Sequence, residues 1–324
     1  MTPTERGLRF DCEGESLVGV LSLPEGQPAE VGVVIAVGGP QVRVGSHRQF
    51  LLLARRLAGA GHAVLRFDVR GMGDATGEFP GFEALGPDLA AAVATLREQV
   101  PAVRRVVLWG LCDAATAALM NVPALGAVPG ALQGVDGLVL LNPWARHADT
   151  QVRTEVKQYY AKRAFDPAFW RKLLAGRVNV FQAAGELAGK LWRVLRSSAA
   201  PAVVADADAD AAGLADAAGL VDADYRERMA RGALSFGGPQ LYILAGKDHV
   251  CAEFLEYSKG HPRLNGLWRR PGVTRLDLPQ ADHTFSSAPL RAQVEDATLR
   301  WLQALKALPV LPVLQALPKA DGGR

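Results

Sequence analysis

Residues 106–120, VVLWGLCDAATAALM, decide the fold that we predict for this chain. The first four residues form a short apolar run, which is typical of a buried strand, and Gly110 follows soon after. The alanine-rich run that starts just after Cys112 is typical of a helix. A nucleophilic side chain, the thiol of Cys112, is therefore expected at the corner between a strand and a helix.

The five residues around this thiol, Gly110-Leu111-Cys112-Asp113-Ala114, have a recognisable spacing. They match the pattern G-x-S-x-G of a nucleophile elbow, with cysteine in place of serine and alanine in place of the last glycine. Small residues are needed two positions before and two positions after the nucleophile, because a larger side chain would collide with the neighbouring backbone of the tight turn. The spacing therefore predicts that Cys112 is a catalytic nucleophile.

The surrounding sequence predicts an α/β fold with a mostly parallel central sheet flanked by helices. Residues 31–37 and 63–67 are apolar runs typical of buried strands, and residues 50–60 between them have the pattern of a helix. Such a β-α-β unit favours a parallel sheet. Two edge strands are predicted within residues 8–23. Further strands are predicted over 137–141, 240–245 and 273–278, and further helices over 82–100, 251–258 and 289–305.

The regular alternation of strands and helices stops near residue 144, which suggests how the domain is organised. We predict a core formed by residues 1–143 and 236–306, interrupted by a helical cap over residues 144–235. The cap includes a low-complexity piece rich in alanine and aspartate, residues 202–224. Residues 307–324 contain three prolines and are predicted to be an appended tail.

Composition excludes several classes of function. The 36 Lys and Arg residues against 33 Asp and Glu give a formal net charge of +3, and no basic run stands out, so no nucleic-acid partner is expected. No apolar stretch reaches the roughly 18 to 20 residues needed to span a bilayer, so no transmembrane segment is expected. The first residues lack the apolar core of a signal peptide, and we expect a cytoplasmic protein.

The three cysteines, Cys12, Cys112 and Cys251, are too few and too scattered for a disulfide framework. None of them is in the C-x-x-C spacing of a zinc site, and neither a metal nor another cofactor is expected. A single cysteine at an elbow then stands out as the candidate nucleophile.

Two later loops are expected to hold the partners of Cys112. Enzymes with a nucleophile elbow carry their catalytic triad in the chain order nucleophile, acid, histidine, with the last two on loops after later strands. Asp248 follows one predicted strand and His283 follows the last one. The histidine would take the thiol proton and deliver it to the leaving group, and the aspartate would hold the imidazole in the useful tautomer. Asp277 and Asp282 are the alternative acids.

An oxyanion hole would complete this site with two backbone amides. One amide is expected from Asp113, the residue next to the nucleophile, and the other from the Gly-Gly loop after the strand over residues 31–37. Because Pro40 has no N–H, the second donor is either Gly39 or Gln41, with Gln41 preferred.

Further polar residues near these loops have predicted roles of their own. The carboxylate of Asp113 suits the start of a helix but opposes ionisation of the neighbouring thiol. His47 and Arg48 follow the Gly-Gly loop closely enough to bind substrate. The glycine-punctuated loop over residues 68–77 is predicted to be scaffold, with its charged side chains paired internally.

Four longer stretches resemble known proteins: VGGPQVRVGSHRQF (37–50), LRFDVRGMGDATGE (65–78), LWGLCDAATAAL (108–119) and LLNPW (140–144). Over about residues 8–305 the chain resembles the α/β-hydrolase superfamily. The four stretches resemble, more narrowly, the exosortase A system-associated hydrolases of type 1. This resemblance implies an α/β-hydrolase fold and a cytoplasmic hydrolase encoded beside exosortase and exopolysaccharide-synthesis functions, with no established substrate.

The cysteine nucleophile is also similar to that of dienelactone hydrolases. The chain departs from those enzymes at Ala114 and in its long predicted cap, so their substrate is not carried over. We expect a hydrolase that cleaves a small-molecule ester or thioester through an acyl-enzyme on Cys112. The alternatives are acyl transfer to a sugar hydroxyl and a catalytically inactive binding protein of the same fold; the sequence does not predict the oligomeric state.

Overall fold

The computed structural model describes residues 3–39, 41–122, 134–146 and 225–306. The strands are Thr4–Cys12 (β1), Glu15–Leu23 (β2), Val31–Ala36 (β3), Val64–Asp68 (β4), Arg105–Leu111 (β5), Gly137–Leu141 (β6), Gln240–Ala245 (β7) and Val273–Leu278 (β8). The α-helices are Gln49–Gly59 (α1), Gly86–Gln99 (α2), Asp113–Asn121 (α3), Tyr225–Ser235 (α8), His249–Gly260 (α9) and Ala288–Lys306 (α10). Short 3-10 helices cover Ser46–Arg48 (η1), Phe82–Ala84 (η2) and Leu264–Arg269 (η3).

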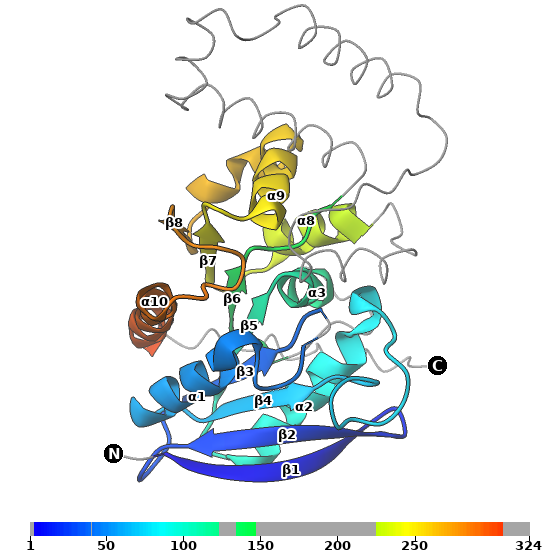
Figure 1. The fold of residues 1–324 in the computed structure, drawn as a ribbon, viewed down its shortest axis with the longest axis vertical. Helices are drawn as coiled ribbons and strands as arrows, with labels where there is room; N and C mark the ends of the chain where they lie inside the picture. The colour runs from blue at the N-terminus through cyan, green and yellow to red at the C-terminus, as the bar shows by residue number, and fades with distance from the viewer. Residues whose placement is uncertain (1–2, 40, 123–133, 147–224, 307–324) are drawn as a thin grey trace, which may run out of the picture.

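All eight described strands belong to one sheet, in the order β1-β2-β4-β3-β5-β6-β7-β8 (Figure 1). β2 runs antiparallel to both of its neighbours, β1 and β4, and every other neighbouring pair is parallel. The strands from β3 to β7 in the middle of the sheet are buried at every residue, as their continuous apolar sequences predicted. The predicted mostly parallel sheet with two edge strands at its start is confirmed.

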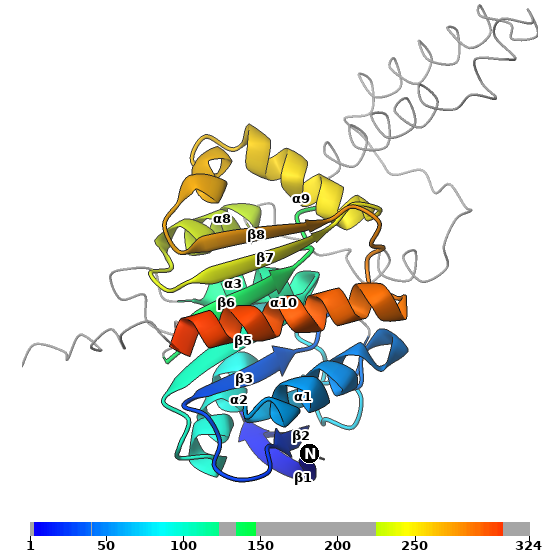
Figure 2. The same ribbon diagram turned by 90° about the vertical axis from the view of Figure 1, so that its left-hand side faces the viewer.

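Helices cover both faces of this sheet. α1 and α10 lie side by side across one face, as Figure 2 shows, and their apolar side chains pack on residues such as Val33, Ile35 and Trp109. α2, α3, α8 and α9 contribute to the core on the other face. Phe50 of α1 meets the edge of Trp109, with ring centroids 5.6 Å apart, so the first helix is anchored directly on β5. No described helix combines the length and apolar character needed to cross a membrane.

The order of the strands locates the crevice in which ligands bind in such sheets. The chain leaves β3 toward β4 on one side and later returns to form β5 on the other side of β3. The place where the strand order reverses in this way is called a switch point. The loops after the two strands that meet there run in opposite directions, which leaves a crevice at the carboxyl ends of the strands. The Gly38-Gly39 loop after β3 and Cys112 after β5 are therefore brought to the same place.

Three elements differ from the predicted boundaries for local reasons. The helix predicted over residues 82–100 is divided into η2 and α2, and Pro87 stands in the first turn of α2, where a missing N–H costs no helical hydrogen bond. β5 continues past Trp109 to Leu111. α9 starts at His249, two residues before Cys251, because the Asp248 side chain caps the helix and accepts from the amides of its first turn.

Most of the predicted cap and all of the predicted tail fall outside the described residues, namely residues 147–224 and 307–324. The last part of the predicted cap segment is helix α8, which packs against α3. A Cβ on Gly232 of α8 would overlap the backbone carbonyl of Leu119, so the two helices approach closely at this glycine. Met229 and Ala230 are fully buried beside it.

Candidate active site

Cys112 occupies a strained turn between β5 and α3. Its backbone has φ 62° and ψ −124°, a conformation that a residue with a side chain adopts only where the surroundings enforce it. The elbow closes so tightly that a Cβ on Gly110 would lie 2.9 Å from the carbonyl carbon of Ala114. The glycine predicted two positions before Cys112 is therefore required by this backbone geometry.

The surroundings of the Cys112 thiol favour its neutral form. Only 6% of the residue is exposed, and burial raises the pKa of the thiol well above its ordinary value. The carboxylates of Asp113 and Asp248 raise this pKa further, whereas the Asp113 amide and the positive charge of Arg146 lower it. The expected opposition between Asp113 and thiol ionisation is confirmed, and the thiol needs a base to take its proton.

His283 and Asp248 meet through a hydrogen bond. The Nδ1 atom of His283 lies 2.8 Å from Oδ2 of Asp248. Since an ionised carboxylate only accepts, Nδ1 carries the proton and Nε2 keeps the lone pair that a base requires. The carboxylate is itself fixed, because it accepts from the amides of Val250 at 3.0 Å and Cys251 at 3.2 Å.

The two alternative acids have other partners. Asp277 is half-exposed on β8 and pairs with Arg275 at 2.8 Å. Asp282 accepts from the amide and hydroxyl of Ser286, and these hydrogen bonds lower the pKa of its carboxyl. The carboxylate that accepts the hydrogen bond from the His283 imidazole is that of Asp248, and its role as the catalytic acid stays a prediction.

Asn142, which follows β6, is a site residue that the sequence reasoning did not find. It is fully buried, and its Nδ2 donates to the carbonyl of His283 at 3.0 Å. Its Oδ1 accepts from the amide of Ala245 at 2.8 Å. One side chain thus connects the ends of two neighbouring strands to the histidine loop. The available signal was a polar residue at the end of the apolar strand over residues 137–141.

A second connection joins the segment after β6 to the elbow. The amide of Trp144 donates to the carbonyl of Cys112 at 3.3 Å, and the hydroxyl of Thr116 donates to the carbonyl of Trp144 at 2.8 Å. Arg146 makes two further contacts: its guanidinium carbon lies 4.8 Å from the centre of the Trp144 ring, and its Nε pairs with Glu253 at 3.2 Å. The segment that follows β6 is therefore fixed next to Cys112 by backbone and side-chain contacts.

Both candidates for the second oxyanion donor are engaged in hydrogen bonds. The amide of Gly39 donates to Oδ2 of Asp113 at 2.8 Å, and the amide of Gln41 donates to the carbonyl of Gly39 at 2.8 Å. The other carboxyl oxygen of Asp113 accepts from the amide of Ala114 at 2.9 Å. The assignment of the oxyanion hole to Asp113 with Gly39 or Gln41 stays a prediction.

An ion-pair network supports the loop that carries Gly39. Asp68 is completely buried and accepts from the amide of Arg43 at 2.6 Å and from its guanidinium group. The same guanidinium reaches Asp74 at 2.6 Å, and Arg70 pairs with Asp88 at 2.8 Å. The charges of the loop over residues 68–77 are paired, but their partners Arg43, Asp88 and Glu13 lie outside the loop and not within it as predicted. The role of this loop as scaffold stays a prediction.

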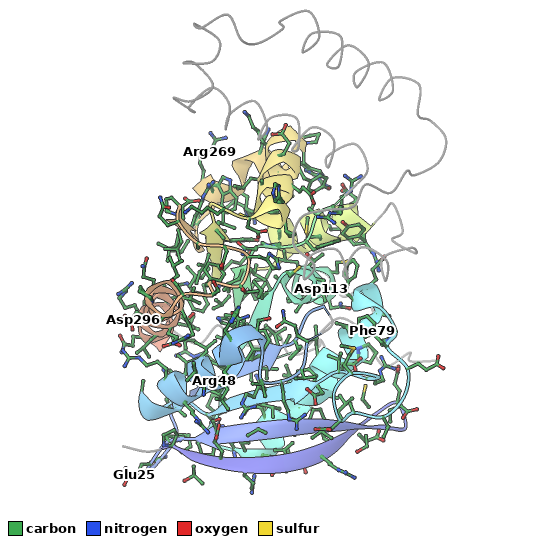
Figure 3. The ribbon with its side chains drawn as sticks, viewed as in Figure 1. Glu25, Arg48, Phe79, Asp113, Arg269 and Asp296 are labelled. Atoms are coloured by element: carbon green, nitrogen blue, oxygen red, sulfur yellow. The ribbon has the colours of Figure 1, made fainter. Side chains whose placement is uncertain are left out.

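His47 and Arg48 lie next to one another at the start of α1. Both are exposed, and both have left-handed backbone conformations, with φ 54° and 62°. Figure 3 shows Arg48 at α1 and Asp113 at α3. The charge of His47 also reaches Asp282 and lowers the pKa of that carboxyl. A role of His47 and Arg48 in substrate binding stays a prediction.

Comparison with known proteins gives a family match over most of the chain. The Alpha/beta hydrolase family matches residues 33–301. A search of curated proteins found no match to the sequence.

Solved structures with a similar fold include three hydrolases. The Pyrococcus furiosus esterase Pf2001 has a TM-score of 0.57 at 15% identity, with 93% of each chain covered. Est1E from Butyrivibrio proteoclasticus, solved with ferulic acid bound, has a TM-score of 0.54 at 14% identity, covering 93% of this chain and 100% of that chain. XC6422 from Xanthomonas campestris, a serine hydrolase without a lid, has a TM-score of 0.50 at 17% identity, covering 95% and 97%. The predicted α/β-hydrolase fold is confirmed.

Proposed function

This chain belongs to the alpha/beta hydrolase family, and we propose that it is an esterase or thioesterase whose nucleophile is Cys112. The observation that carries the proposal is the strained elbow at Cys112, together with the hydrogen bond of 2.8 Å between His283 and Asp248 at the same edge of the sheet. Strained backbone conformations are concentrated at functional sites, and a nucleophile elbow holds its nucleophile in one.

In the acylation step the thiol of Cys112 attacks the carbonyl carbon of the substrate. A C–S bond forms, the thiol proton passes to Nε2 of His283, and the carbonyl electrons move onto the oxygen. The imidazolium that results is stabilised by the carboxylate of Asp248. When the tetrahedral adduct collapses, the bond to the leaving group breaks and His283 returns the proton to the departing alcohol or thiol.

In the deacylation step a water molecule attacks the thioester on Cys112 and gives a proton to His283. The second tetrahedral adduct breaks its C–S bond, the acid product leaves, and the thiol recovers its proton. Because burial raises the pKa of the Cys112 thiol, the resting enzyme holds a neutral thiol and not a thiolate–imidazolium pair. The proton therefore passes to His283 as the sulfur attacks the carbonyl carbon. In both steps the amide of Asp113 is proposed to donate to the oxyanion.

The wider setting of the protein is proposed from the sequence. The four stretches that resemble exosortase A system-associated hydrolases suggest a cytoplasmic enzyme that works beside exopolysaccharide synthesis. The structures with a similar fold include an esterase, and the substrate proposed for this chain is a small acyl ester or thioester. His47 and Arg48 are proposed to contact that substrate from the start of α1.

The proposal is tested by mass spectrometry of the intact protein mixed with p-nitrophenyl acetate or an acetyl thioester. We expect a burst of leaving group and one acetyl adduct on Cys112, and Cys112→Ala removes both. Cys251→Ala is the matched control, because this thiol is also buried but lies on α9, and its adduct and burst are expected to remain. A turnover unchanged in Cys112→Ala would overturn the proposal.

The same experiment separates the two other functions. If glycerol or another polyol added to the reaction becomes acetylated faster than the ester is hydrolysed, the protein is an acyltransferase. The hydrogen bond from the Gly39 amide to Asp113 supports the inactive alternative, because it occupies an amide that an oxyanion would need. If no adduct forms and iodoacetamide labels Cys112 no faster than Cys12 or Cys251, the protein is an inactive member of the fold.

A further inference from the structure

The carboxylate of Asp113 accepts a hydrogen bond from the amide of Gly39, one of the two candidates for the second oxyanion donor. Its Oδ2 atom accepts the Gly39 amide proton at 2.8 Å, and Gly39 stands in the loop after β3 that faces the elbow. That loop is the expected source of the second oxyanion donor. If Gly39 is that donor, the Asp113 carboxylate accepts the hydrogen bond that the oxyanion of an acyl-transfer adduct would need.

The surrounding backbone is shaped to receive this carboxylate. A Cβ on Gly38 would overlap Oδ1 of Asp113 and would also lie 2.8 Å from the amide nitrogen of Ala114. Oδ1 accepts from that same amide at 2.9 Å. The glycine before Gly39 is therefore needed for the side chain to reach both amides, and the contact is a defined part of the elbow.

An oxyanion and this carboxylate cannot share the Gly39 amide, because two negative oxygens would compete for a single donor proton. Removing one oxyanion donor from an acyl-transfer enzyme lowers its rate by about 100- to 1,000-fold. Occupation of the donor by Asp113 is expected to slow acylation in the same manner.

We propose that Asp113 gates the oxyanion hole: its carboxylate holds the Gly39 amide in the resting enzyme and releases it when a substrate displaces the side chain. The proposal rests on the proposed hydrolase function. It makes Asp113 a specificity-determining residue. A substrate with hydrogen-bond donors beside its carbonyl group offers the carboxylate new partners. Small activated esters have no such group and acylate Cys112 more slowly than that substrate does.

Two variants separate the occupied donor from the charge. Asp113→Asn removes the charge and leaves one acceptor oxygen for the two amides of Gly39 and Ala114, and Asp113→Ala removes the charge and both acceptors. Two rate constants are measured for each protein: acetylation of Cys112 by p-nitrophenyl acetate, which uses the oxyanion hole, and alkylation by iodoacetamide, which does not. Both variants are expected to alkylate faster than the wild type, because a charge that opposes the thiolate is gone.

The ratio of acetylation to alkylation reports on the gate. We expect it to rise by about 10- to 100-fold in Asp113→Ala, which has no acceptor, and by less in Asp113→Asn, whose single oxygen still competes for the Gly39 amide. Asp113→Ser, which keeps a polar side chain one atom shorter, is expected to behave as Asp113→Ala does and serves if the alanine variant does not fold.

The outcomes distinguish this inference from the function on which it rests. A ratio that is unchanged or lower in both Asp113→Ala and Asp113→Ser overturns the gate but leaves the esterase intact. If neither the wild type nor any Asp113 variant forms more acetyl adduct than the background level of Cys112→Ala, both the gate and the proposed function are wrong.

Discussion

The imidazole Nδ1 of His283 lies 2.8 Å from the carboxylate Oδ2 of Asp248, although 35 residues separate them in the chain. The two residues stand on the loops after β8 and β7, which are parallel neighbours in the sheet. The same carboxylate caps α9, so the side chain that orients the imidazole is also fixed by a helix. This double role of Asp248 can be separated by mutation.

Asp248→Asn is expected to lower kcat/KM for p-nitrophenyl acetate by about 1,000- to 10,000-fold, because a neutral amide allows the wrong histidine tautomer. Asparagine is a good helix cap, so the melting temperature is expected to change little. Asp277→Asn is the control and should retain activity, since Asp277 pairs with Arg275 on β8. Equal losses in the two variants would mean that Asp248 is not the acid.

Asn142→Ala is expected to lower the free energy of unfolding by about 2 kcal/mol, because a buried donor and a buried acceptor lose their partners. Activity should also fall, since the His283 loop loses its hydrogen bond to the end of β6. Urea denaturation and kcat measure the two effects. Asn121→Ala is the matched control, because the partner of the Asn121 side chain among the described residues is the carbonyl of Ala117 within its own helix. A smaller loss at Asn142 than at Asn121 would contradict this role.

Arg43→Met is expected to destabilise the protein by about 3 kcal/mol, because Asp68 would remain as a buried carboxylate without its cation. Arg55→Met removes an ion pair with Glu5 in which the arginine side chain is half-exposed, and should cost less than about 1 kcal/mol. Urea denaturation of the two variants measures the difference. Equal effects would show that the Arg43 pair adds nothing to the support of the Gly39 loop.

Cys12 is expected to make the folded protein less stable at alkaline pH. Burial, and to a lesser extent the charge of Asp88, raises the pKa of its thiol to about 11 from the ordinary 9.0. The folded state then holds a proton that the unfolded chain releases. The resulting stabilisation is present below about pH 9 and is lost as the pH rises toward 11.

This loss is measured by urea denaturation of the wild type and Cys12→Ala across that range. The free energy of unfolding of the wild type should fall more steeply, by roughly 1 kcal/mol per pH unit. Parallel curves for the two proteins would contradict a raised pKa at Cys12. The comparison cancels the titration of residues that both proteins share.

Much of the fold could be predicted because it depends on local patterns. Continuous apolar runs indicated the buried strands, and the break after Trp109 indicated the corner that holds Cys112. The order of Cys112, Asp248 and His283 followed from where the polar residues stand after strands. The single helix predicted over residues 82–100 was wrong, and Pro87 in the first turn of α2 was the sequence signal for a helix that begins there.

Other features depend on which side chains meet across segments that are far apart in the chain, and no periodicity encodes that. The sequence by itself determined an elbow with a thiol and an ordered set of partners. Only the tertiary structure decided that Asp248 meets His283, that Asn142 ties the histidine loop to β6, and that Asp113 occupies the Gly39 amide. The physical reason is that parallel strands bring their carboxyl ends together, and the direction of each side chain there is set by the turn that follows.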